Sequence, residues 1–93
     1  MVGQVLEDET PVAWQAIPRH APVLAADGSE IGTADSLLGD EDEDIFHGIV
    51  VRRGEDGHMV ELPARRIVRM TTRRVFTDLT PSDGATLPPY RKR

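Results

Sequence analysis

From Pro22 onward, apolar residues alternate with polar ones or gather in short β-branched runs, and turn residues separate these stretches. A period of two is typical of a strand with one buried face, and a continuous apolar run is typical of a strand that is buried on both faces. The pattern predicts six short strands, over residues 22–26, 30–38, 45–53, 58–62, 68–70 and 73–78. Six strands at this spacing favour a mostly β domain, built as a small antiparallel barrel or sandwich.

The strongest local signals lie in the first half of this pattern. The dipeptide Asp27-Gly28 is typical of a tight hairpin turn, and Gly32 in the returning strand indicates a bulge or a bend. Residues 45–53 are β-branched and almost continuously apolar, so we expect this strand at the centre of the sheet. Residues 63–67 are expected to form a short turn or a single 3₁₀ turn, because Pro63 cannot donate to a ladder.

The two ends of the chain differ from the strands between them. Thr10 as N-cap and Pro11 at the first helical position predict a short helix that ends before Pro18. Residues 80–84 are expected to form a turn, and residues 87–93 a Pro-rich basic tail that is extended or disordered. The predicted organisation is an N-terminal extension over 1–18, a β domain over 19–80 and a tail over 81–93.

Trp14 is the largest side chain in the N-terminal extension. It lies three residues before Ile17, so the two share one face of the predicted helix. We favour Trp14 as a plug at one end of the core, because a large aromatic residue usually buries most of its area. The alternative makes Trp14 an exposed anchor for a partner, and hence a candidate interaction residue. The sequence leaves open whether this segment docks on its own β domain or on a neighbour.

The composition limits how such a domain can be stabilised. The chain has 93 residues and no cysteine, which fits one domain held by apolar packing, a β ladder or a partner subunit. One Trp, one Tyr and two Phe give a small core, and small cores often gain stability by oligomerising. With no secretory h-region and no apolar stretch of roughly 20 residues, we expect a soluble, cytoplasmic protein. The dominance of Arg over Lys is typical of a bacterial source.

The net charge of −5 conceals a division between the two halves of the chain. Residues 1–44 carry one Arg and eleven acidic residues, a net −10, whereas residues 45–93 carry ten basic and five acidic residues, a net +5. We favour the simpler interpretation, in which the halves neutralise each other within the fold. The alternative is an acidic and a basic face, suited to head-to-tail assembly or to a charged partner.

The acidic residues are densest in one predicted loop, which contains Asp40, Glu41, Asp42, Glu43 and Asp44. A Ca²⁺ loop needs an internal glycine and a late bidentate carboxylate, and this loop has neither. We therefore predict no metal site here and favour an exposed acidic surface loop that keeps a strand edge from pairing wrongly. Weak binding of a divalent ion stays open.

Catalytic chemistry finds no support in the residue pattern. The three histidines match no zinc spacing, and no serine lies in a glycine-rich elbow. No phosphate-binding loop is present. We therefore predict no enzyme activity, no catalytic residue and no cofactor. If Phe46 lies in the core, its neighbour His47 lies on the surface.

The second half of the chain holds a cluster of basic residues that we predict as a candidate interaction surface. Its members are Arg65, Arg66, Arg69, Arg73 and Arg74. Because a guanidinium group can bind phosphate with two hydrogen bonds, weak RNA or anion binding through these residues is the alternative function. The pI of about 5.0 and the absence of interleaved aromatic residues count against it.

Four stretches, in this order, resemble the PRC-barrel domain family. The run Val23–Thr33 resembles its entry hairpin, V-x-x-x-DG-x-x-IG-x-V, and Ile45–Arg52 resembles its central apolar strand. Val60–Val68 and Val75–Leu79 resemble its later strands. The resemblance covers about residues 20–79 and implies a stand-alone bacterial member with a six-stranded barrel or sandwich.

Members of this family resemble one another in fold and look like interaction modules without shared catalytic residues. The resemblance therefore implies a non-enzymatic interaction or assembly module, and it transfers no functional residue to this chain. We expect a protein partner that the sequence does not name, and a homo-oligomer in which a dimer is favoured.

Overall fold

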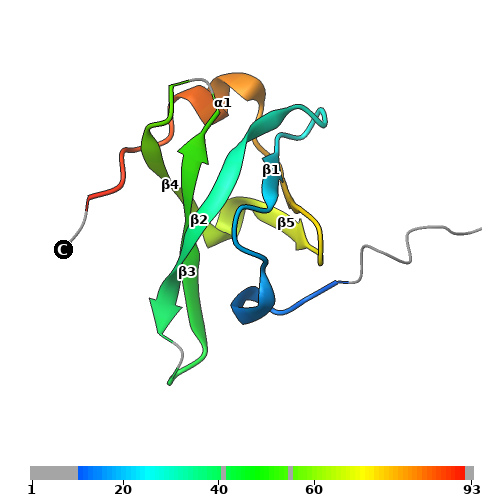
Figure 1. Ribbon diagram of the computed structural model, residues 1–93, viewed down its shortest axis with the longest axis vertical. Coiled ribbons are helices and arrows are strands. Elements are labelled where there is room, and N and C mark those ends of the chain that lie inside the picture. Colours follow the sequence, from blue (N-terminus) through cyan, green and yellow to red (C-terminus); the bar gives the residue numbers. More distant parts are fainter. Residues whose placement is uncertain (1–10, 41, 55, 92–93) are drawn as a thin grey trace, which may run out of the picture.

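The computed structural model of this chain describes residues 11–40, 42–54 and 56–91 (Figure 1). The elements within these residues are η1 (Trp14–Ala16), β1 (Pro22–Leu24), β2 (Glu30–Asp40), β3 (Ile45–Arg53), β4 (Met59–Pro63), η2 (Ala64–Arg66), β5 (Ile67–Met70), β6 (Val75–Thr77) and α1 (Pro81–Ala85). The mostly β class and the six strands are therefore confirmed, and the bounds of β3 agree with the prediction. None of the helices in this part of the chain is long and apolar enough to cross a membrane.

The six strands form one sheet in the order β4-β3-β2-β1-β6-β5. Neighbouring strands are antiparallel except β1 and β6, which run parallel with Val23 opposite Val75. The prediction of a purely antiparallel sheet is therefore wrong at this pair. The reason is that β2 already occupies one edge of β1, and the β5–β6 hairpin reaches the other edge with β6 in the direction of β1.

The hairpin of β2 and β3 is the longest unit of the sheet. Its pairing runs from Gly32 opposite Arg53 to Asp40 opposite Ile45, and its far end extends beyond the rest of the molecule (Figure 1). The pairing of β1 with β2 shifts register beside Gly32, where the sequence indicated a bulge or a bend. The apolar β3 is paired on both sides, as expected of an inner strand, but it is second from the β4 edge of the sheet rather than at its centre.

Trp14 closes one end of that core. It is 8% exposed, and its ring stacks on Phe46 with centroids 5.1 Å apart. Its indole Nε1 donates a hydrogen bond to Asp44 Oδ1 at 3.2 Å. The structure thus favours the plug, and the alternative of an exposed anchor is wrong because the side chain is buried.

The N-terminal segment forms less helix than predicted. It makes a single 3₁₀ turn, η1, whose N-cap is Ala13 and has no side-chain cap, and the predicted cap Thr10 lies outside the described residues. Just before this turn, Pro11 bridges to Thr71, and the Val12 N–H donates to Met70 O at 3.1 Å. The segment therefore docks on its own sheet, beside the end of β5.

The C-terminal region corrects the predicted tail over 81–93. Residues 81–85 form helix α1, in which the Thr80 hydroxyl accepts from Asp83 N and the Asp83 carboxylate accepts from Thr80 N. This capping box holds a helix that the sequence analysis treated as a turn. Residues 87–91, here called the C-terminal strap, are extended as predicted but are bound along β4. The Glu61 N–H donates to Pro88 O and the Tyr90 N–H donates to Met59 O.

Candidate binding groove

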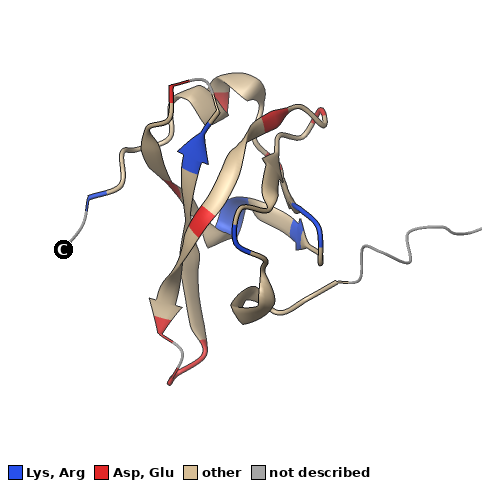
Figure 2. Cartoon of the chain, viewed as in Figure 1, with Lys and Arg blue, Asp and Glu red and all other residues tan. Residues whose placement is uncertain are grey.

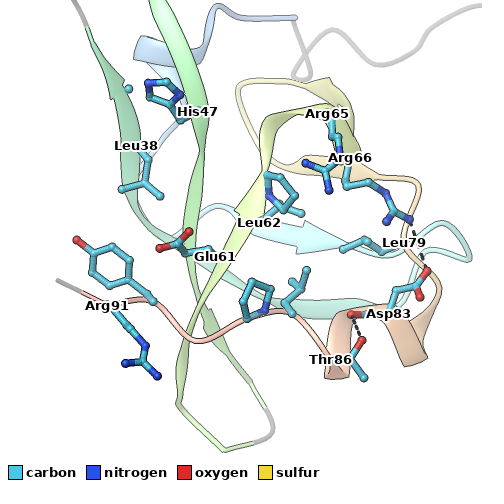
Figure 3. A pocket seen from close by; sticks show the side chains of 15 residues that line it. Leu38, His47, Glu61, Leu62, Arg65, Arg66, Leu79, Asp83, Thr86 and Arg91 are labelled. Atoms are coloured by element: carbon cyan, nitrogen blue, oxygen red, sulfur yellow. Dashed lines mark hydrogen bonds and ion pairs between the residues drawn. The ribbon is translucent and has the colours of Figure 1, made fainter. Parts of the chain in front are cut away.

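A groove of about 820 Å³ opens between β4, η2, α1 and the C-terminal strap (Figure 3). Its lining residues are Leu38, Gly39, His47, Glu61, Leu62, Pro63, Arg65, Arg66, Leu79, Asp83, Thr86, Leu87, Pro88, Tyr90 and Arg91. This volume lies in the range of ordinary ligand-binding sites. The strap follows α1 in the chain and is joined to β4 by the hydrogen bonds from Glu61 N to Pro88 O and from Tyr90 N to Met59 O.

The floor of the groove is apolar. Leu62 and Leu79 belong to the buried core and lie beneath the floor at 0% and 1% exposure, so the apolar surface open to a ligand comes from half-buried side chains such as Leu38 and Leu87. Leu38 and His47 reach the groove from the β2–β3 hairpin (Figure 3). The floor thus continues the core of the sheet, and the strands that fix the core also fix the floor.

The rim of the groove is charged. Arg65 and Arg66 lie on one side of it, and Glu61 lies on the other side near Arg91 (Figure 3). Pro63 ends the β4 ladder, and η2 then carries both arginines to the groove before β5 begins. The short turn or single 3₁₀ turn predicted for residues 63–67 is thus confirmed as a 3₁₀ turn.

Arg66 is held against the molecule by two carboxylates. Its Nε lies 2.6 Å from Asp78 Oδ1, and its Nη2 lies 3.5 Å from Asp83 Oδ2. The hydrogen bond that it donates to Asp78 is the main reason why the pKa of Arg66 is raised above its ordinary value. Arg66 therefore joins η2 to the residue that follows β6 and to α1.

Asp83 is the acidic partner in that arrangement. Hydrogen bonds from the Thr80 backbone and then the Thr80 hydroxyl, followed by the charge of Arg66, lower the pKa of Asp83 below its ordinary value. Asp83 is thus ionised at neutral pH and balances Arg66. The rim charges left for a ligand are Arg65, Arg91 and Glu61, and neither arginine makes an ion pair with any residue that the structure describes.

The structure divides the five arginines that were predicted as one surface. Arg65 and Arg66 line the groove, whereas the other three do not. The guanidinium of Arg69 lies over the ring of Phe76, 5.7 Å from its centroid. Arg73 and Arg74 belong to the turn before β6, where their backbone N–H groups donate to the Thr71 hydroxyl.

Several groove residues were missed by the sequence analysis. His47 was placed only on the surface, where it is exposed, and Tyr90 and Arg91 were assigned to a tail without a binding role. A signal was available in the strap, because Leu87 and Tyr90 supply apolar side chains beside prolines that keep the chain extended. That signal does not show which strand the strap contacts.

The acidic loop is held by its own side chains. Asp40 Oδ1 accepts from the backbone N–H groups of Asp42 and Glu43 at 3.0 and 3.3 Å, and Asp44 Oδ1 accepts from Gln15 Nε2 at 2.9 Å. Glu41 lies outside the described residues. Within residues 11–40, 42–54 and 56–91, no three His, Cys, Asp or Glu side chains are arranged to hold a metal ion.

Comparison with known proteins adds no relative: no protein-family model matches this chain, and neither does any curated protein. The resemblance to PRC-barrel domains stays a prediction from the sequence pattern.

Proposed function

We propose that this chain is a non-enzymatic interaction and assembly module of PRC-barrel type, which binds a partner protein in the groove beside β4. The groove itself is the observation that carries this proposal. It combines an apolar floor, continuous with the core, with a rim on which Arg65 and Arg91 make no ion pair with described residues. Protein-binding sites typically place apolar contacts at the centre and charged groups at the rim.

The lining of the groove suits binding better than catalysis. It includes one histidine and no serine or cysteine, and the Thr86 hydroxyl already donates to Asp83 O at 3.1 Å. An imidazole-activated nucleophile therefore has no candidate among the lining residues. The charged groups that remain can pair with a ligand and orient it.

The PRC-barrel type is supported by where the four resembling stretches fall. Val23–Thr33 runs from β1 into the first part of β2, and Ile45–Arg52 covers most of β3. Val60–Val68 runs from β4 through η2 into β5, and Val75–Leu79 covers β6. Each stretch thus corresponds to a unit of the sheet in the order that the family pattern implies. We propose on this basis that the sheet closes as a small barrel.

Weak RNA or anion binding is the less favoured function. It requires Arg65, Arg66, Arg69, Arg73 and Arg74 to act together, and Arg66 is already paired with two carboxylates. Inorganic phosphate and mixed RNA therefore serve as test ligands rather than as the proposed partners.

Site-specific photo-crosslinking tests the proposed function. A benzoylphenylalanine in place of Tyr90 keeps an aromatic ring in the groove, and the same residue in place of the exposed Ala26 serves as a control outside it. We expect protein adducts from position 90 and not from position 26. Arg65→Glu is expected to abolish these adducts, and Arg19→Glu, an equal charge change outside the groove, is expected to leave them unchanged.

Equal adducts from both positions, or none from position 90, would contradict the proposal. RNA or phosphate binding at about physiological salt that is lost in Arg65→Glu, without any protein adduct, would favour the anion-binding function instead.

A further inference from the structure

We propose that the partner in the groove is a second copy of this chain, whose β2–β3 hairpin tip docks at the η2 end of the groove. The acidic tip is defined as Asp40, Asp42, Glu43, Asp44 and Ile45. This inference rests on the proposed function, because it names the occupant of the same groove.

The acidic tip offers charge and apolar surface together. The hairpin extends beyond the rest of the molecule, and its tip is acidic (Figures 1 and 2). Asp42 and Glu43 are exposed and make no ion pair with any described residue, and the neighbouring Ile45 is 42% exposed. A partner surface that matches the tip must therefore supply cations beside an apolar depression.

The described residues of the tip are tied by hydrogen bonds to one another and to η1. The ladder continues to Asp40 opposite Ile45, and the Asp40 carboxylate accepts two backbone hydrogen bonds from within the tip. Asp44 is tied to Trp14 and Gln15 at the plugged end of the core. A preorganised tip loses little conformational entropy on binding, which favours association.

The η2 end of the groove supplies what the tip needs. Arg65 stands there beside the apolar floor, and Lys and Arg residues gather on η2, β5 and the turn after β5 (Figure 2). The one lining carboxylate outside the Arg66 pairing, Glu61, lies on the opposite side of the groove (Figure 3). Carboxylates of a tip that docks at the η2 end therefore lie beside Arg65 and away from the like charge of Glu61.

The acidic tip of a chain does not occupy the η2 end of that chain's own groove. Leu38 and His47, near the far end of the hairpin, already line the groove, and the described residues show no ion pair between the tip and Arg65. Strand pairing holds the tip at the edge of its own groove. Two copies related by a two-fold axis across the groove would bring each tip to the Arg65 of the other, which closes a dimer.

Light scattering on purified variants at several salt concentrations tests this dimer. Asp42→Lys/Glu43→Lys reverses charges in the tip without removing Asp40 or Asp44, whose side chains hold it, and Arg65→Glu reverses the charge of the groove. We expect each variant to raise the dimer Kd by about tenfold or more, and high salt to weaken the wild-type dimer. Arg19→Glu, which lies outside the groove, is expected to dimerise as the wild type does.

The decisive measurement is the Kd of a mixture of the two charge-reversed variants, Asp42→Lys/Glu43→Lys and Arg65→Glu. The lysine tip of one variant then meets the glutamate that Arg65→Glu introduces in the other, while an acidic tip meets Arg65. We therefore expect the mixture to regain a Kd near that of the wild type. A mixture that stays monomeric although both variants are folded by circular dichroism would overturn the proposal. A wild-type chain that is monomeric at every concentration and salt would do the same.

These outcomes are separable from failure of the proposed function. If the wild-type chain is monomeric while position 90 still crosslinks to another protein, the groove binds a different partner and only the self-docking inference falls. If the wild-type chain dimerises but Arg65→Glu and the tip variant leave the Kd unchanged, the dimer uses another surface and the self-docking inference falls as well.

Discussion

The centre of the core and the rim of the groove are built from different interactions. In the centre, Ile49 and Leu62 are 0% exposed, and the backbones of β3 and β4 approach closely at Gly48. At the rim, η2, α1 and the strap are joined by the Arg66 ion pairs, the capping box at Thr80 and a few backbone hydrogen bonds. Stability therefore depends on volume and shape in the centre, and on charge and hydrogen bonding at the rim.

This difference means that the rim can change without unfolding the sheet. Surface ion pairs contribute little to stability, whereas buried apolar side chains contribute several kcal/mol each. A binding surface built on such a rim can vary in charge while the floor stays fixed.

Gly48→Ala is expected to have the largest effect. Gly48 has a φ of 155°, and an added Cβ would lie 2.2 Å from the carbonyl oxygen of Leu62. Strand β4 cannot move away without breaking the ladder, so we expect the free energy of unfolding to fall by at least about 3 kcal/mol. Chemical denaturation measures this, with Gly54→Ala as the matched control, because no described atom lies within 4 Å of that site. Similar losses in both variants would show that β3 and β4 are not closely packed.

Leu62→Ala and Leu87→Ala compare the floor with the strap directly. Leu62 is 0% exposed, whereas Leu87 is half-buried against the core. We expect the free energy of unfolding to fall by about 2–4 kcal/mol for Leu62→Ala and by clearly less for Leu87→Ala, because a site at the edge of the core can collapse or fill with water. Denaturant titration of both variants decides this. A larger loss for Leu87→Ala would make the strap part of the central core.

Acidification is expected to loosen the rim before the centre. The pKa of Asp83 is lower in the folded chain than in the unfolded chain, chiefly because Thr80 donates to its carboxylate. The resulting stabilisation is complete above the unfolded value, about 4, and is lost as the pH falls through the folded value. Hydrogen exchange should therefore show the Gly84 amide, which donates to Thr80 O, losing protection below about pH 4 while the Ile49 amide keeps it.

Asp83→Asn provides the control for this titration. We expect the variant to have low protection at Gly84 already at neutral pH, with little further change on acidification. The variant Asp35→Asn, changed on β2 outside the groove, should lose protection at the Gly84 amide over the same pH range as the wild type. Simultaneous loss of protection at Gly84 and Ile49 in the wild type would contradict a separate rim.

Arg66→Gln is expected to have the smallest effect. It removes the ion pairs with Asp78 and Asp83, which lie at the surface and are screened by salt. We expect a small fall in Tm, less than for Leu87→Ala, that disappears at about 1 M salt. Arg19→Gln, for which no ion pair is found among the described residues, is the matched control. A fall in Tm as large as that of Leu62→Ala would place Arg66 among the main stabilising residues.

The local elements were largely predictable from the sequence. The alternation and β-branched runs predicted all six strands, and Pro63 predicted the turn at η2. Helix α1 was missed although Thr80, Pro81 and Asp83 form a capping box with proline at the first position, because a glycine inside a five-residue helix favours a turn. The N-terminal helix was overestimated, because three residues of 3₁₀ turn suffice to bury Trp14.

The groove was much less predictable. Arg65 and Arg66 were singled out for their charge, yet one of them is paired internally and the other faces an apolar floor. Their neighbours in the groove, His47 and Arg91, lie far from them in the sequence. No spacing rule connects residues that meet only because the strap turns back along β4.

The sequence by itself determined the period-two strands, the hairpin turn at Asp27-Gly28 and the division of charge along the chain, because these depend on neighbouring residues. Only the tertiary structure decided the parallel pairing of β1 with β6, the choice of Phe46 as the residue on which Trp14 stacks, and the position of the strap on β4. Each of these joins segments that are distant in sequence. Such contacts form only where the whole set of apolar faces and strand edges can be satisfied together.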